Sequence, residues 1–146
     1  MENLWDFNLI DKSDRLNVNK ILTEQAEYFN NNYSFGKAIV KISYNETINE
    51  FLEELVIKNE EYNYELFILS ASYILDFKNI KVRVDIDFLY DLREKLKDQE
   101  SINFKDICYG YIEVDTLSDF IKLIKVILRS PEVVKSINDL KYIVIG

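Results

Sequence analysis

The residues best suited to chemistry are two aspartates one residue apart, at the end of the segment KNIKVRVDID (residues 78–87). Hard cations such as Mg²⁺ prefer carboxylate oxygens, so Asp85 and Asp87 are the first candidates for a metal-dependent enzyme or a nucleotide-handling domain. Strand alternation places both on one face together with Lys81 and Arg83, whose positive charges offset the negative potential that a metal needs. We therefore expect a solvated strand face, with Asp87 capping the helix that follows, rather than a metal site.

The rest of the chain offers few catalytic groups. It contains no histidine, which removes the commonest general base and the Ser–His and Cys–His nucleophile pairs. The single cysteine, Cys108, lies in an apolar segment and is expected to be a buried, inert thiol. No glycine motif for phosphate binding occurs, and we expect neither a cofactor nor a bound metal. Four acids gather around one predicted strand and helix start, and we interpret them as solvent-facing: Asp106, Glu113, Asp115 and Asp119.

The least even distribution of charge lies in residues 46–65, ETINEFLEELVIKNEEYNYE, which hold seven glutamates and one lysine. Carboxylates complement a basic partner, while tyrosines supply large, stiff contact area. A solvated face has the same composition, so both interpretations stay open. The residues that we expect to bind a partner are Glu53, Glu54, Glu60, Glu61, Tyr62 and Tyr64.

The overall composition is that of one acidic globular domain. A chain of 146 residues with a net charge of −8 is long enough to bury most of its unfolded surface, and we predict a single domain over 1–146 with an irregular arm at 1–16. The negative charge disfavours direct binding to nucleic acid or to an anionic membrane. We see no signal peptide and no apolar run near the ~18 residues that span a bilayer, and with one cysteine we expect a cytoplasmic protein.

Apolar periodicity predicts the elements of the first half. A helix is expected over 18–31, because its apolar residues fall on one face. Alternation predicts a strand over 36–44, and residues 64–73, apolar on both faces, are typical of a central strand.

Residues 46–58 are ambiguous. Thr47 and Glu50 have the spacing of a capping box, which favours a short helical start followed by a strand near 54–58. The alternative is two strands around a polar turn at 58–61.

The second half is expected to hold two strands and three helices, with Ser130 and Pro131 ending one helix and starting the next. The expected strands are 79–86 and 106–114, the expected helices are 87–99, 116–129 and 131–141, and an extended tail follows at 142–146. Short connections between neighbouring strands favour antiparallel pairing. The predicted fold class is α+β: a mainly antiparallel sheet of about four to five strands packed with helices, one N-terminal and two C-terminal.

Three segments carry a resemblance: ILTEQAEYF near the start, YNYELFIL in the middle and DFIKLIKVILRSPEVVKSINDL near the end. Together they resemble a pattern of small single-domain cytosolic proteins of bacteria. The motifs concern packing, so the resemblance implies a compact domain and assigns no functional residues. In size and acidity the chain is also similar in character to immunity proteins that neutralise partner toxins.

The leading prediction is a noncatalytic acidic domain that binds a protein partner with a basic surface, as an immunity or antitoxin-type inhibitor of a basic bacterial toxin does. The first alternative is the metal-dependent enzyme or nucleotide-handling domain that would use Asp85 and Asp87. The second is a structural or homo-oligomeric subunit, joined through the C-terminal YIVIG segment or an exposed strand edge. The oligomeric state stays open.

Overall fold

The computed structural model describes residues 18–74, 79–98 and 110–145. The predictions for the arm at 1–16, for Asp106 and for Cys108 lie outside these residues. Among the helices described, none is both long enough and apolar enough to cross a bilayer.

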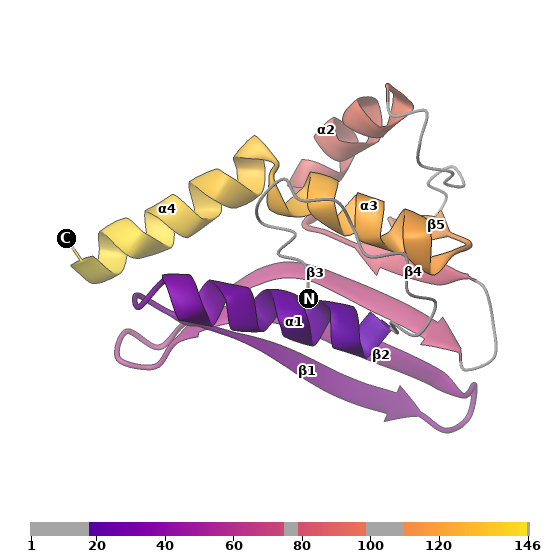
Figure 1. The fold of residues 1–146 in the computed structure, drawn as a ribbon, viewed down its shortest axis with the longest axis horizontal. Helices are drawn as coiled ribbons and strands as arrows, with labels where there is room; N and C mark the ends of the chain where they lie inside the picture. Colours follow the sequence, from indigo (N-terminus) through magenta and orange to yellow (C-terminus); the bar gives the residue numbers. More distant parts are fainter. Residues whose placement is uncertain (1–17, 75–78, 99–109, 146) are drawn as a thin grey trace.

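Within the described residues, five strands form one antiparallel sheet whose spatial order is the order of the chain (Figure 1). Their bounds are β1 Lys37–Asn45, β2 Glu50–Asn59, β3 Tyr64–Ile74, β4 Ile80–Arg83 and β5 Ile112–Val114. The central position predicted for residues 64–73 is confirmed, because β3 pairs with β2 on one side and β4 on the other. The α+β class and the mainly antiparallel sheet are confirmed as well.

In the part of the chain that the structure describes, four helices accompany the sheet, and their bounds are α1 Val18–Asn32, α2 Ile86–Lys97, α3 Leu117–Leu128 and α4 Pro131–Ile145. Helix α1 packs on β1 and β2, α3 lies against β5 and α4, and α4 contacts β3. Figure 1 shows α1 and α3 crossing the same face of the sheet. Helix α2 is tied to the start of α4 by an ion pair between Lys95 Nζ and Glu132 Oε2, 3.4 Å apart.

The strand register divides the sheet into a covered inner face and an open outer face. Residues paired across the inner face are buried beneath the helices, namely Ala38, Leu55, Ile57, Leu69, Ala71, Val82 and Ile112. The outer face carries charged side chains, among them Lys81 of β4 opposite Glu113 of β5. Lys41 of β1 and Glu65 of β3 form an ion pair on the same face.

The helical start predicted within residues 46–58 is wrong, because the segment is a turn followed by β2. Asn49 has φ 53°, and the side chain of Asn45 accepts a hydrogen bond from the Thr47 N–H at 3.0 Å. Asparagine tolerates the left-handed conformation and stabilises turns in this way. The β1–β2 register then runs without interruption up to the pair Asn45–Glu50. Cross-strand pairing therefore outweighs the local capping-box signal.

The cap of α2 is also different from the prediction. Strand β4 ends at Arg83, so its alternation does not reach the two aspartates. Asp85 is the N-cap of α2, and its carboxylate accepts a hydrogen bond from the Asp87 N–H at 2.9 Å. Asp87 lies in the first turn, where a negative charge is favourable.

The junction of α3 and α4 follows the prediction, whereas the C-terminal tail does not. Ser130 Oγ donates to the Ile127 carbonyl at 2.6 Å and accepts from the Val133 N–H at 3.3 Å, so one side chain links both helices. The extended tail predicted at 142–146 is wrong, because α4 continues to Ile145. Val144 packs on the core in helical spacing with Leu140, and this burial extends the helix.

The strand predicted over 106–114 is confirmed for residues 112–114, while residues 106–109 lie outside the described residues. Strand β5 begins at Ile112, and Gly110 before it has φ 80°, a left-handed conformation outside the extended region. A Cβ built at Gly110 meets nothing within 4 Å. The backbone conformation, rather than close packing, is therefore what calls for glycine there.

Candidate protein-binding surface

The six residues predicted to bind a partner do not form one surface. Glu53 and Glu54 are neighbours in β2, so their side chains point to opposite faces of the sheet. Glu60, Glu61 and Tyr62 lie in the turn between β2 and β3. The turns at the two ends of the 10-residue strand β2 are roughly 30 Å apart at ~3.3 Å per residue. The acidic stretch 46–65 therefore spans the whole length of the sheet.

Glu53 is enclosed within the protein, with an exposed fraction of 0%. Its Oε1 accepts a hydrogen bond from Asn19 Nδ2 of α1 at 2.7 Å, and its Oε2 accepts one from the hydroxyl of Tyr73 on β3. A buried carboxylate is costly unless hydrogen bonds replace its water. Glu53 joins α1 to two strands, and because it has no exposed area we remove it from the candidate surface.

Tyr73 is perturbed by this contact. Burial of the phenol, followed by its hydrogen bond to Glu53 and the negative charge of that carboxylate, raises the pKa of Tyr73 well above its usual range. The phenol thus stays protonated at physiological pH. The Tyr73 hydroxyl therefore remains a hydrogen-bond donor to Glu53 at physiological pH.

Two further predicted residues have structural surroundings. Tyr64 begins β3, is half-buried and packs against the hydrophobic core. Glu54 is half-buried on the outer face, opposite Lys41 in β1 and Ser70 in β3. Tyr64 flanks the turn that carries the other candidates, opposite Asn59, but its side chain packs on the core, and Glu54 lies in the middle of β2.

Glu60, Glu61 and Tyr62 form what we call the acidic tip. All three are exposed, and the exposed fraction of Tyr62 is 49%. The tip is held by the asparagines on either side of it. Asn63 has φ 49°, and its N–H donates to the Glu60 carbonyl at 3.2 Å. Asn59 Oδ1 accepts a hydrogen bond from the Tyr62 N–H at 3.0 Å.

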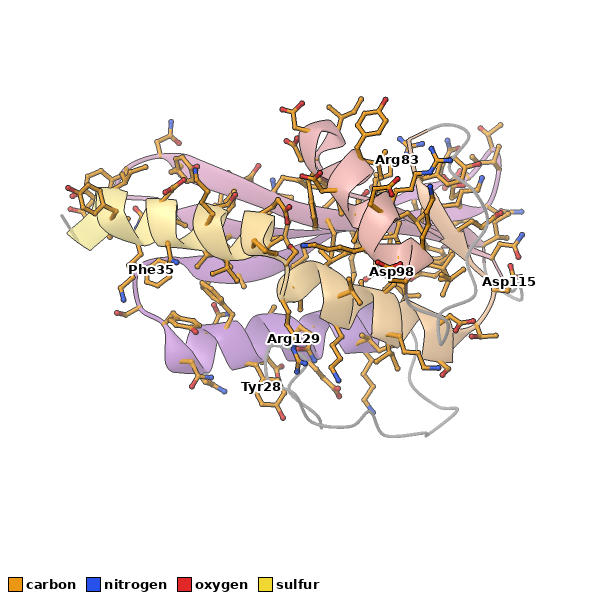
Figure 2. The ribbon with its side chains drawn as sticks, turned by 90° about the horizontal axis from the view of Figure 1, so that it is seen from above. Tyr28, Phe35, Arg83, Asp98, Asp115 and Arg129 are labelled. Atoms are coloured by element: carbon orange, nitrogen blue, oxygen red, sulfur yellow. The ribbon has the colours of Figure 1, made fainter. Side chains whose placement is uncertain are left out.

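The side chain of Asn59 also anchors the tip to the body of the protein. Its Nδ2 donates to the Phe35 carbonyl at 2.8 Å, in the loop between α1 and β1. The Phe35 ring is buried and packs edge-on against Phe29 of α1, with 5.7 Å between centroids. Figure 2 shows Phe35 beside the C-terminal half of α4, and a Cβ built at the adjacent Gly36 lies 3.5 Å from Leu140 Cδ2. The tip is therefore fixed on a packed support.

Sequence reasoning missed two tyrosines at the same end of the molecule. Tyr33 follows α1 and is 48% exposed, and Tyr142 lies near the end of α4 and is 75% exposed. Figure 1 shows the C-terminal ends of α1 and α4 and the β2–β3 turn at one end of the sheet. Three exposed tyrosines thus come from segments far apart in the sequence. The sequence gives no local signal for this grouping, because the grouping depends on residues 142–145 being helical and the sequence predicts them to be extended.

The alternative sites have structural explanations. Asp85 and Asp87 share the capping hydrogen bond of α2, and within 18–74, 79–98 and 110–145 no group of three or more acidic, cysteine or histidine side chains could hold a metal ion. Thr116 caps α3 by accepting from the Asp119 N–H at 3.0 Å, and its hydroxyl donates to Asp119 Oδ2 at 3.0 Å. Asp119 is buried in this cap, so its interpretation as solvent-facing is wrong. Glu113 lies opposite Lys81 in the sheet.

No protein-family model, curated protein or solved structure matches the chain.

Proposed function

We propose that the protein is a noncatalytic binding domain that recognises a basic surface of another protein through the acidic tip. The observation that carries this proposal is the combination of two exposed carboxylates and an exposed tyrosine on a turn held by Asn59 and Asn63. A turn that is already ordered loses little conformational freedom on binding, so more of the interaction energy appears as affinity.

The charges of the tip and of the whole chain favour the same kind of partner. Glu60 and Glu61 are adjacent and exposed, and the net charge of the chain is −8. The electrostatic field of these negative charges accelerates association with a basic protein surface and repels an acidic one. Tyr62 supplies the aromatic contact area that commonly dominates the affinity of an interface.

The specific form of the proposal is an immunity or antitoxin-type inhibitor that occludes the basic surface of a bacterial toxin. Small size, acidity and an ordered acidic turn support it. A cytoplasmic location belongs to the same proposal, because such an inhibitor meets its toxin inside the cell that makes it.

The test begins with capture of the partner from the native cell and with the genes encoded beside this one, where a toxin gene would support the specific form. Association with the purified partner is then measured for Tyr62→Ala and for the double variant Glu60→Lys/Glu61→Lys. We expect Tyr62→Ala to weaken binding by roughly five- to 150-fold, and the double variant to slow association and flatten its salt dependence.

The matched control is Glu46→Lys/Glu94→Lys, which changes the net charge equally at exposed positions outside the tip. It should retain most of the association rate. Unchanged binding in folded tip variants, or an equal loss in the control, would contradict the proposal.

A further inference from the structure

Among the described residues, strand β1 is the terminal strand of the sheet and pairs with β2 on one side only. On its other side, the Asn30 side chain of α1 bonds the backbone of Ala38 through both N–H and C=O, at 2.7 and 2.9 Å. The backbone of Ala38 therefore points away from β2. Because successive residues of a strand alternate in this respect, the backbone groups of Val40, Ile42 and Tyr44 point away from β2 as well.

Within the described part of the chain, the segment of this edge from Val40 to Tyr44 is not covered by a lysine in the way that edge strands commonly are. Lysines on an edge usually discourage pairing with another chain, but Lys41 is bound to Glu65 of β3 and thus turned across the sheet. The apolar residues that follow are open, since the exposed fractions are 55% for Ile42 and 46% for Tyr44. Asn30 covers the backbone of Ala38. Beyond Ala38, the outward backbone N–H and C=O groups of β1 lie beside the exposed side chains of Ile42 and Tyr44.

We propose that this edge pairs antiparallel with the same edge of a second copy of the chain, with the two-fold axis at Ile42. Two five-stranded sheets then join into one continuous sheet. The proposal concerns a surface separate from the acidic tip and does not depend on the proposed function.

The choice of a second copy rests on the fit of the edge to itself. With the axis at Ile42, the outward backbone groups of Ile42 face their own equivalents, and those of Val40 face those of Tyr44. All three outward-facing residues then exchange hydrogen bonds, and Lys41 lies opposite Ser43 rather than a second lysine. An axis at Lys41 would place two lysines directly opposite each other, which is unfavourable. An axis at Ser43 would leave Val40 beyond the end of the partner strand.

The test is sedimentation velocity over a range of protein concentrations with the full chain. We expect a reversible dimer that strengthens with added salt, because two chains of charge −8 repel at low ionic strength. Ile42→Lys puts two charges at the axis and should raise the dissociation constant at least tenfold. The control is Ile48→Lys, an equally exposed residue in the β1–β2 turn outside the paired segment, which should leave the dimer intact. Circular dichroism verifies that each variant is folded.

Disulfide trapping tests the register independently. In a Cys108→Ser background, Lys41→Cys and Ser43→Cys chains mixed together should cross-link on mild oxidation, because facing residues without mutual hydrogen bonds are about 4.5 Å apart at Cα. Either variant alone places its two cysteines roughly 8 Å apart, beyond the usual limit, and should cross-link far more slowly. A chain that stays monomeric up to about 1 mM, a dimer unaffected by Ile42→Lys, or equal cross-linking of the single variants would each overturn the proposal.

Discussion

The side-chain amide of Asn30 takes the place of a neighbouring strand for Ala38, because it both donates to and accepts from that residue's backbone. One side chain of α1 thereby satisfies the outward N–H and C=O groups of Ala38 at the edge of the sheet, and it fixes the helix on β1. It also marks the point at which the open part of the edge begins.

Asn30→Ala should therefore destabilise the fold. Two partly buried backbone groups lose their partners, and we expect a cost of about 1–3 kcal/mol in the free energy of unfolding. The measurement is urea denaturation. Asn32→Ala is the control, because the side chain of Asn32 donates to the Tyr28 carbonyl in an exposed setting and its loss should cost much less. Equal losses in the two variants would contradict this role for Asn30.

Tyr73→Phe should remove a hydrogen bond from the buried Glu53 carboxylate and cost about 1–3 kcal/mol near pH 7. The pKa of Tyr73 is raised in the folded state. Its contribution is thus complete below the ordinary tyrosine pKa of about 10 and is lost as the pH rises above it. The wild type should lose stability more steeply than Tyr73→Phe above about pH 10, since the other nine tyrosines are common to both. Parallel alkaline profiles would be inconsistent with this contact.

Gly36→Ala should destabilise the support of the acidic tip. The added methyl group would lie 2.8 Å from Ile57 Cγ2 and 3.4 Å from the Lys58 carbonyl oxygen, and Ile57 is fully buried. Overpacking of this kind costs about 1–3 kcal/mol. In a double-mutant cycle, Ile57→Ala should relieve part of the cost of Gly36→Ala, so that the two losses sum to more than the loss in the double variant. Strict additivity would show that the methyl group is accommodated elsewhere.

The two aspartates should differ in their contribution to stability. Asp85→Ala removes the N-cap of α2 and should cost about 0.5–2 kcal/mol. Asp87→Ala removes a first-turn charge and should cost about 0.3–1 kcal/mol. Thermal unfolding of both variants tests whether Asp85→Ala loses more stability than Asp87→Ala. The midpoint of the wild type should be the same with EDTA and with Mg²⁺ or Mn²⁺, and a rise of several degrees that both variants abolish would restore the metal hypothesis.

Elements whose own periodicity decides their structure were predictable. A few neighbouring residues are enough to determine three of these features: the apolar face of α1, the alternation in β1 and the helix junction at Ser130–Pro131. The start of β2 was not predictable, because pairing with β1 overrides a local helix signal. The C-terminal turn of α4 depends on packing against the core in the same way.

The candidate surface was predictable only in part. Glu60 and Glu61 follow a strand in a polar segment, so an exposed turn was expected there. The burial of Glu53 had a signal, since Glu53 alternates in phase with the apolar residues Leu55 and Ile57. The grouping of Tyr33 with the acidic tip had no signal in the sequence. It arises because the C-terminal end of α1 and the β2–β3 turn lie at the same end of the sheet.

The sheet order has a consequence for the speed of folding. Each described strand pairs with the next described strand along the chain, so three consecutive strands, β1 to β3, can form by closing two short turns. Closing a short loop sacrifices little chain entropy, and domains dominated by contacts between near neighbours in sequence fold faster than those with distant pairings. Among the described strands, the β4–β5 pair has helix α2 between its two members and therefore forms after that helix has been made. The N-terminal hairpins can therefore assemble while the ribosome is still adding the later helices.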